Sequence, residues 1–379
     1  MKRVGIVTFY KSENVGAVLQ AYALQKKLCK LGCQAEIIQY TDKIKRFAKM
    51  NSVKRVLHKL WYDIIKRKVL RDQKWKRTCR FVDKYIVLSK ETYTSAAILH
   101  QSPPEYDIYI TGSDQVWNPS ITGNDESYFL TFAPQEKIKI SYGASMGNIG
   151  VLNKNPAKMK YLLSQLDAIS VRERDATVAI SRLIDREVTQ VLDPTLLLNV
   201  DDWSSLTADM SPLIEKPFIL CYYIPGDKSI EKGIRKTAEY LKEKTGYQIV
   251  NLGKKDWEKV RLKRSDVFNN GPIEFLWYVQ HAAFVVTNSF HGTAFSINFQ
   301  KPFFVPKKAD ENQSKSRSSR IVSILELIDL SGRLFEIDNE GNPISNSYPC
   351  ENVDFSEPHM KLNVLRNKAT EFLVNNCRL

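Results

Sequence analysis

One histidine lies where the sequence changes from a strand pattern to a helix pattern. The stretch Thr287 to Phe299 follows an apolar run and contains Asn288 and Ser289, which are good helix-capping residues, before His291 and Gly292. The first turn of a helix offers amide N–H groups to anions, and glycine lets a ligand approach the backbone closely. A phosphate or carboxylate bound there would raise the pKa of the histidine and favour a proton-donating form. The pattern predicts an active-site turn; the alternative is a histidine that only caps the turn.

A second dense motif, YITGSDQVWNPS, spans Tyr109 to Ser120. It follows a predicted buried strand and puts Ser113 and Asp114 at the carboxyl end of that strand. Three roles are open for Asp114: capping the next segment, orienting a partner, or taking a proton from a sugar hydroxyl. Trp117 suits either a core position or stacking on a sugar ring.

Cationic residues follow two further strands. In SVRERDA, Arg172 comes directly after an apolar strand, where it is either solvated or holds a carboxylate or phosphate through paired hydrogen bonds. The polar loop 307–320 follows another strand. It is equally typical of a lid that orders on an anionic ligand and of a solvated loop.

The elements that must position these motifs alternate between strand and helix patterns. A strand over 4–10, a turn at Asn14 and Gly16, a helix stopped by Gly32 and a strand over 35–40 open the chain. Later strands are predicted over 107–110, 138–142, 168–171, 188–192, 218–223, 248–252, 284–286 and 303–305. Helices are predicted over 159–166, 230–244, 273–280, 293–298 and 359–375. This alternation indicates doubly wound parallel sheets, which bind ligands outside the carboxyl ends of their strands.

We therefore predict an α/β protein with two Rossmann-like domains that face each other across a cleft, because 379 residues exceed one ordinary domain. The first domain covers 1–205, with a basic helical insertion at 43–90, and the second covers 206–350. A C-terminal helix in 351–379 is expected to return toward the first domain.

The positive charge is concentrated in one segment. The formal net charge is +14, and residues 43–90 contain 17 Lys and Arg against three Asp, so the rest of the chain is neutral. Apolar residues from Val53 to Ile65 recur at helical spacing among these cations. Such a helix suits an anionic membrane surface, and the alternative is a helix packed on the protein with a solvated basic face. No recognised motif for reading nucleic acid accompanies it, so no nucleic-acid partner is expected.

The remaining composition points to a cytoplasmic protein. Six cysteines are scattered without a disulfide or zinc framework, so we expect free thiols and no metal. The apolar N-terminal run is short and has no cleavage site, and no stretch reaches the roughly 20 apolar residues that span a bilayer. The basic segment allows a peripheral position on the inner face of the cytoplasmic membrane.

Taken together, these motifs resemble the polysaccharide pyruvyl transferase family. Matching segments recur in order from near residue 3 to beyond residue 333, and the most specific are GSDQVWN at 112–118 and SFHGTAFSI at 289–297. Supporting segments are NVGAVLQAYAL, VRE, LDPT, GPIEFL, KPF and SRI. The family implies a fold like that of GT-B glycosyltransferases. It also implies transfer of pyruvate from phosphoenolpyruvate to two sugar hydroxyls, which forms a cyclic ketal and needs no cofactor.

The resemblance also assigns roles by position. His291 would be the general acid or a phosphate contact, and Arg172 would hold the carboxylate or phosphate of the donor. Among the loop cations Lys307, Lys308, Arg317 and Arg320, only Arg320 aligns by motif. The other implied substrate contacts are Asn14, Gly16, Ser113, Asp114, Asn288, Ser289 and Gly292. Val15 stands where the family usually has an aromatic residue, which leaves acceptor contacts near it open.

The acceptor implied by the resemblance is a glycan, in such pathways often carried on a polyprenyl diphosphate at the inner membrane face. The alternative enzyme is a nucleotide-sugar-dependent glycosyltransferase of the GT-B type. A third hypothesis is a basic protein that binds a membrane surface or nucleic acid without catalysing a reaction.

Overall fold

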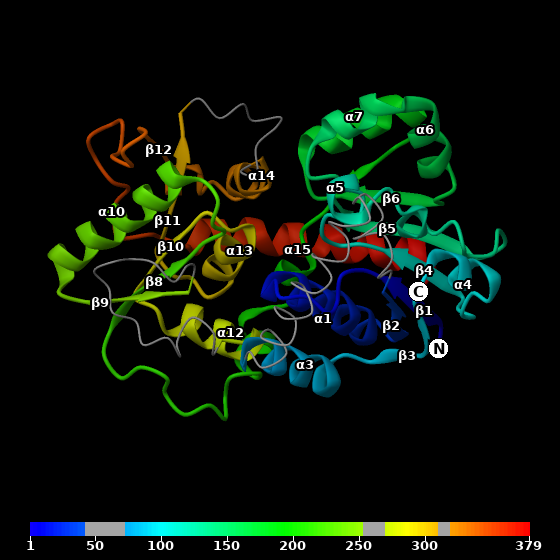
Figure 1. Cartoon of the computed structure of the whole chain (residues 1–379), viewed down its shortest axis with the longest axis horizontal. Coiled ribbons are helices and arrows are strands. Elements are labelled where there is room, and N and C mark those ends of the chain that lie inside the picture. The colour runs from blue at the N-terminus through cyan, green and yellow to red at the C-terminus, as the bar shows by residue number, and fades with distance from the viewer. Residues whose placement is uncertain (42–72, 253–269, 310–318) are drawn as a thin grey trace, which may run out of the picture. The chain divides into compact units, whose positions relative to one another are not determined.

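The computed structural model describes residues 1–41, 73–252, 270–309 and 319–379 of the chain. These residues form two compact units (Figure 1). Unit 1 contains Met1–Leu197 together with Asn367–Leu379, and unit 2 contains Leu198–Arg366. Each unit is built around its own parallel sheet, and the candidate motifs are distributed over both.

Unit 1 has a sheet of seven parallel strands in the order β3-β2-β1-β4-β5-β6-β7. The chain order reverses between β1 and β4, as in a Rossmann fold. Because the crossovers on either side run in opposite directions, helices cover both faces, α1 and α3 on one and α6 and α7 on the other (Figure 1). The strands are β1 (Arg3–Val7), β2 (Gln34–Tyr40), β3 (Leu88–Tyr93), β4 (Ile108–Thr111), β5 (Ile138–Ala144), β6 (Ala168–Val171) and β7 (Thr189–Gln190).

The helices of unit 1 connect these strands. They are α1 (Val15–Lys30), α3 (Gln73–Tyr85), α4 (Ala96–Gln101), α5 (Pro119–Thr122), α6 (Pro156–Ser164), α7 (Arg174–Ile184) and α8 (Pro194–Leu197). The central strands are buried on both faces, with Ile6 and Ile110 on one face and Val7 and Tyr109 on the other, because a parallel sheet covered by helices has no solvated side.

Unit 2 has five parallel strands in the order β12-β11-β10-β8-β9. They are β8 (Phe218–Tyr222), β9 (Gln248–Asn251), β10 (Phe284–Thr287), β11 (Phe303–Lys308) and β12 (Leu334–Ile337). Its helices are α9 (Val200–Ser204), α10 (Lys228–Thr245), α12 (Pro272–His281), α13 (Phe290–Asn298) and α14 (Ser319–Leu327). One face of the amphipathic α10, with Ile234, Ala238 and Leu241, packs into a core with Ile219 and Val286.

The last helix, α15 (Ser356–Cys377), belongs to both units. In unit 2, Arg366 donates hydrogen bonds from Nη2 to Leu198 O and Asn298 Oδ1 at 3.3 and 2.7 Å. In unit 1, Lys2 Nζ donates to Cys377 O at 2.9 Å, and the ring of Phe372 lies 6.3 Å from that of Tyr142. The expectation of two Rossmann-like domains and a C-terminal helix that returns to the first one is confirmed.

The structure divides the chain at 197/198, where the sequence placed the boundary at 205/206. The segment 43–90, expected as a helical insertion, contains α3 and the start of β3 in its described part, and β3 pairs with β2 as a regular sheet strand. The amphipathic stretch from Val53 to Ile65 lies outside the described residues.

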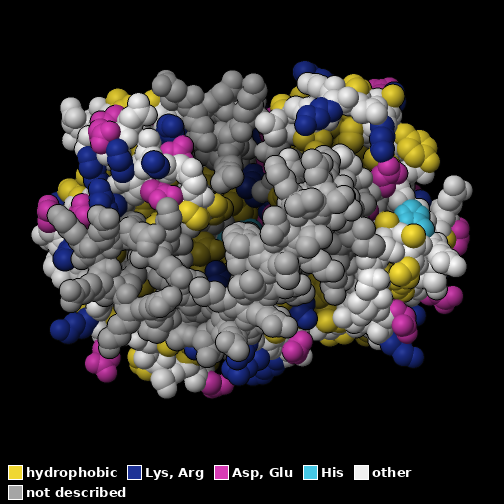
Figure 2. Space-filling model, in the orientation of Figure 1, with side chains coloured by type: hydrophobic (Ala, Val, Ile, Leu, Met, Phe, Trp, Pro, Cys, Tyr) yellow, Lys and Arg dark blue, Asp and Glu magenta, His cyan; other side chains and the backbone are white. Residues whose placement is uncertain are grey.

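The described helix α3 carries part of the basic charge on one side. Lys76, Arg80 and Lys84 recur every four residues and are exposed. Phe81 and Val82 on the opposite side are buried, and the Phe81 ring lies 5.6 Å from that of Tyr22 in α1. Figure 2 shows Lys and Arg side chains gathered where α3 lies in Figure 1. None of the described helices is long and apolar enough to cross a membrane.

Candidate functional site

His291 lies in the first turn of α13, directly after β10 ends at the carboxyl edge of the unit 2 sheet. Ser289 is the N-cap of this helix, and its Oγ accepts a hydrogen bond from Gly292 N at 3.4 Å. The His291 side chain is 4% exposed and is therefore held among protein atoms. A turn of this kind places an imidazole next to the positive end of a helix dipole, where an anion is stabilised.

Gly292 is required by packing. A Cβ at this position would lie 2.3 Å from Thr287 Oγ1 and 3.1 Å from Tyr222 Cδ1. The interpretation that this glycine leaves space for a ligand therefore has a second explanation, because the protein itself fills the space. Tyr222 is half-buried, and desolvation raises the pKa of its phenol to about 12 although a hydrogen bond with Ser289 lowers it. The turn is thus held against the ends of β8 and β10.

Asn288 ties the turn to the loop that follows β8. Its Oδ1 accepts from Ile224 N at 2.8 Å, and its Nδ2 donates to Ile224 O at 3.1 Å. Both ends of the amide are used in this way, so the side chain positions the loop between β8 and α10. The same loop ends at Asp227, the N-cap of α10, whose side chain accepts from Ser229 N and Ile230 N at 2.9 and 3.2 Å.

Three of the four cations proposed to contact an anionic ligand fall within the described residues. The Arg320 guanidinium lies 5.8 Å from the centre of the Phe290 ring, which in turn lies 5.3 Å from the His291 ring. Lys307 pairs with Glu336 at 3.1 Å and Lys308 with Asp227 at 3.4 Å. Arg320 is therefore the cation that the structure connects to the histidine turn, through Phe290. Arg317 lies outside the described residues.

A buried ionic cluster occupies the carboxyl ends of β4, β6 and β7 in unit 1. Arg172 Nη1 donates to Asp193 Oδ2 at 2.5 Å, and Arg172 Nη2 lies 3.5 Å from Asp114 Oδ1. Ser113 Oγ donates to the same Asp193 oxygen at 3.1 Å. Burial lowers the pKa of Arg172, but Asp193, Glu173 and Asp114 together raise it above its ordinary value. The arginine is held inside the protein by carboxylates, so the alternative of a solvated side chain is wrong.

Sequence reasoning missed two members of this cluster as site residues. Asp193 accepts hydrogen bonds from Thr195 N and Thr195 Oγ1 at 2.9 and 2.7 Å in addition to that from Arg172. Glu173 Oε1 accepts from Ser145 Oγ at 2.6 Å. The motifs LDPT and VRE contained both residues, but only the neighbouring order of β5, β6 and β7 shows that they face the same edge.

The segment NVGAVLQAYAL has a structural role at the start of α1. Asn14 is the N-cap, and its Oδ1 accepts from Gly16 N at 3.1 Å.

Trp117 is buried, stacks on Phe129 with ring centres 5.2 Å apart, and donates from Nε1 to Tyr128 O at 2.9 Å. Trp117 is thus a core residue, which is the first of the two roles considered for it.

The predicted site residues therefore form two groups, one at the carboxyl edge of each sheet. Unit 1 holds Ser113, Asp114 and Arg172, with Asn14 and Gly16 at the adjoining end of α1. Unit 2 holds Asn288, Ser289, His291, Gly292 and Arg320. Among the described residues, no group of three His, Cys, Asp or Glu side chains is arranged to hold a metal ion.

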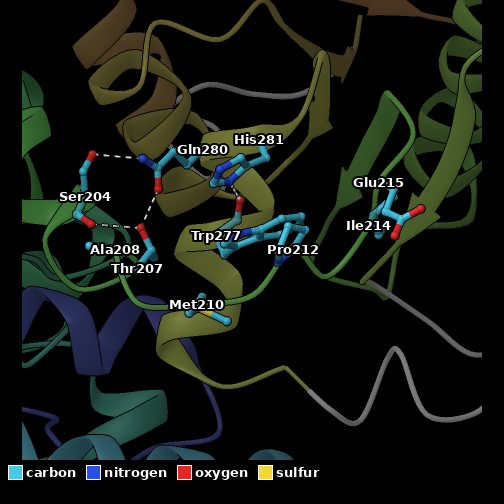
Figure 3. Close-up of a pocket in the computed structure, with 10 residues that line it drawn as sticks. All are labelled: Ser204, Thr207, Ala208, Met210, Pro212, Ile214, Glu215, Trp277, Gln280 and His281. Atoms are coloured by element: carbon cyan, nitrogen blue, oxygen red, sulfur yellow. Dashed lines mark hydrogen bonds between the residues drawn. The ribbon is translucent and has the colours of Figure 1, made fainter.

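A pocket of about 630 Å³ opens near the amino ends of the strands of the unit 2 sheet (Figure 3). Its walls come from α9, the segment before β8, and the end of α12, which precedes β10. Figure 3 shows Gln280 bonded to Ser204 and Thr207, while His281 stacks on Trp277 with ring centres 4.3 Å apart. Gln280 already pairs with its neighbours, and no predicted site residue lines the pocket. This pocket is therefore not the candidate site.

The two parallel sheets and the sites at their carboxyl edges define a GT-B-like α/β protein. The chain is similar to a putative UDP-N-acetylglucosamine 2-epimerase from Listeria monocytogenes, with a TM-score of 0.52 at 11% identity over 97% of this chain and 90% of that one. It also resembles the 2-epimerase of Neisseria meningitidis (TM-score 0.48, 11% identity, 100% and 99% covered) and Escherichia coli ADP-heptose heptosyltransferase II (0.40, 14%, 97% and 99%). At such identities the likeness concerns the fold alone.

A family model for polysaccharide pyruvyl transferase matches residues 14–305, which include both groups of predicted site residues except Arg320. The chain belongs to the polysaccharide pyruvyl transferase family. A comparison with curated protein sequences found no match.

Proposed function

We propose that the protein transfers pyruvate from phosphoenolpyruvate to two hydroxyls of one sugar in a glycan, forming a cyclic ketal and releasing phosphate. The observation that carries the proposal is the position of His291 in the first turn of α13, at the carboxyl edge of a parallel sheet, in a chain of this family. Ligands of doubly wound sheets bind at that edge.

The unit 2 edge suits the anionic donor. Phosphoenolpyruvate carries a phosphate and a carboxylate, and both are stabilised by helix N-terminal amides and by cations. The N-terminal end of α13 supplies the amides, and Arg320 supplies a guanidinium beside Phe290 of the same turn. We therefore assign the main donor contacts to this turn, with Ser289 and Asn288 holding its shape.

The chemistry needs a proton at the methylene carbon of the donor. Protonation of C3 leaves a positive, oxocarbenium-like centre at C2, which one sugar hydroxyl attacks. Phosphate then leaves as the second hydroxyl closes the ring. His291 is proposed to give the proton to C3 or to hold the phosphate, and either role requires the position it has.

Arg172 is proposed as a second contact for the carboxylate or phosphate of the donor. Its guanidinium is already bonded to Asp193 and lies near Asp114, so its orientation is set before a ligand arrives. The same carboxylates offset part of its positive charge. An anion would consequently gain less from Arg172 than from an arginine without acidic neighbours.

The acceptor is proposed to be a lipid-linked glycan, with the protein placed peripherally on the inner face of the cytoplasmic membrane. The charge distribution supports this proposal, because the whole positive excess lies in residues 43–90. The described part of that segment presents Lys76, Arg80 and Lys84 on one side of α3. Anionic lipids attract such a surface by about 1 kcal/mol per cation.

The decisive experiment follows phosphate release from phosphoenolpyruvate in the presence of candidate glycans, with mass spectrometry of the pyruvylated product. His291→Ala should lower turnover by about 10²–10⁴-fold, as expected for the loss of a general acid. His281→Ala, on the exposed end of α12, is the matched control and should leave turnover unchanged.

Calorimetry separates the two roles of His291 and the two candidate donors. Phosphoenolpyruvate that still binds His291→Ala without turnover indicates the acid, and lost binding indicates the phosphate contact. Binding of UDP- or GDP-sugars without binding of phosphoenolpyruvate would replace the proposal by a nucleotide-sugar glycosyltransferase.

A further inference from the structure

The pocket near the amino ends of the unit 2 strands lies wholly within that unit (Figure 3). A hydrogen-bonded group that joins α9 and the turn after it to α12 holds one wall in place. Thr207 Oγ1 donates to Gln280 Oε1 at 2.6 Å, and Gln280 Nε2 donates to Ser204 Oγ at 3.0 Å. At about 630 Å³, the pocket has the size of small-molecule sites in proteins. Unit 2 therefore keeps a hollow of ligand size away from its carboxyl edge.

Trp277 offers this pocket a hydrogen-bond donor. The side chain lines the pocket although it is only 3% exposed, and its ring stacks on that of Phe218 with centres 6.2 Å apart. Within the described part of the chain, Nε1–H of Trp277 donates to no acceptor and is not sealed off from solvent. Buried indole N–H groups usually have a partner. This N–H is therefore available to an oxygen atom of a ligand, and an ordered water would be the inert alternative.

The other lining residues disfavour an anionic ligand. None of the described residues that line the pocket is Lys or Arg, and the exposed Glu215 adds a carboxylate (Figure 3). Met210, Pro212 and Ile214 supply apolar surface. These walls suit a neutral ligand that has an apolar face and oxygen atoms that form hydrogen bonds. A sugar ring meets this description, because its C–H groups pack on apolar side chains and its hydroxyls bond to N–H groups and carboxylates.

We propose that this pocket is a second binding site for the glycan, an inference that rests on the proposed pyruvyl transfer. It binds a neutral sugar several units away from the sugar that receives pyruvate. His291 follows the carboxyl end of β10, whose four residues span roughly 13 Å, and the pocket lies near the amino end of the same sheet. Only a glycan of several sugars reaches both places. Long acceptors therefore gain affinity from the second contact, and short ones do not.

Nuclear magnetic resonance of the full chain, labelled with ¹⁵N in tryptophan, tests binding directly. The indole N–H signal of Trp277, identified by its loss in Trp277→Phe, should shift with a Kd of about 1 mM when N-acetylglucosamine, galactose or mannose is added. Phosphoenolpyruvate should not shift it. Ile214→Asp puts a charge in the apolar wall and should weaken binding about tenfold, whereas Leu213→Asp adds the same charge at an exposed neighbour outside the lining. No shift with any of the three sugars, or equal affinity in Ile214→Asp, would overturn the proposal and leave a water-filled hollow.

Pyruvyl transfer to glycans of increasing length tests the link to catalysis. Ile214→Asp should raise KM for a long acceptor about tenfold and KM for a disaccharide far less, while Leu213→Asp behaves as the wild type. An equal loss with short and long acceptors would contradict a second site. A wild-type protein that consumes no phosphoenolpyruvate would reject the proposed function, whereas the indole signal would still decide whether the pocket binds sugar.

Discussion

The carboxyl edges of the two sheets differ in the charge of the side chains that gather there. In unit 2, α13 begins at the end of β10 and brings amide dipoles and His291 to one turn, and Arg320 of α14 lies beside Phe290 of that turn. In unit 1, the corresponding edge is filled by one arginine among three carboxylates. The first arrangement favours an anionic ligand, and in the second the carboxylates offset part of the positive charge of the arginine. Two sheets of the same architecture therefore differ in the charge that the residues at their strand ends present.

The largest effect on stability is expected from removing Arg172, the cation at the carboxyl edge of the unit 1 sheet. Arg172→Met leaves the buried charges of Asp193 and Asp114 uncompensated and should lower the free energy of unfolding by about 3–5 kcal/mol. Denaturant unfolding measures the loss, and hydrogen exchange should locate it in β4 to β7. The double variant Arg172→Met/Asp193→Asn should recover part of it, since one of the unpaired charges is gone. A double variant less stable than the single one would contradict this account of the cluster.

The cations on α3 test whether the outer surface of unit 1 binds anionic lipid, which is a role separate from those of the carboxyl edges of the two sheets. Replacing Lys76, Arg80 and Lys84 by Gln should weaken binding to phosphatidylglycerol vesicles roughly 100-fold, from about 1 kcal/mol per cation. Sedimentation with vesicles measures the effect, and phosphatidylcholine vesicles should bind neither protein. The matched control replaces Lys228, Arg235 and Lys242, exposed on α10, by Gln. Equal losses in both variants would show a response to net charge without a membrane surface on α3.

Gly292 tests how tightly the histidine turn of unit 2 is packed. Gly292→Ala pushes a methyl group into Thr287 Oγ1 and should lower the free energy of unfolding by about 1–3 kcal/mol. Gly332→Ala is the control in the same unit, because its methyl group meets no atom within 4 Å. A fully stable but inactive Gly292→Ala would show that the glycine serves ligand approach instead of packing.

The sequence predicted the central strands well and missed two at the sheet edges. β6 was expected over 168–171 and spans Ala168–Val171, because a buried strand is a short and mostly apolar run. β3 and β12 were missed. Both lie at the end of a sheet, and β3 exposes Lys90, Glu91 and Thr92, so its pattern lacks the apolar signal. Edge strands are recognised by their backbone partners, which a local pattern does not show.

The candidate site was predictable where its residues are consecutive. The strand, cap and helix around His291 are encoded within one short stretch and were recognised in it. The cluster around Arg172 joins residues up to 80 positions apart, as in the hydrogen bond from Ser113 to Asp193. Its composition follows from which strands are neighbours, so Asp193 and Glu173 looked like ordinary polar residues in the sequence.

The helix shared by the two units makes the core of unit 1 depend on residues that follow unit 2 in the chain. All seven strands of unit 1 are synthesised before unit 2 begins, but the unit also needs Asn367–Leu379, including the buried Phe372 and Cys377. Unit 1 therefore cannot complete its core until the residues that follow Arg366 are made, although its sheet strands are synthesised first.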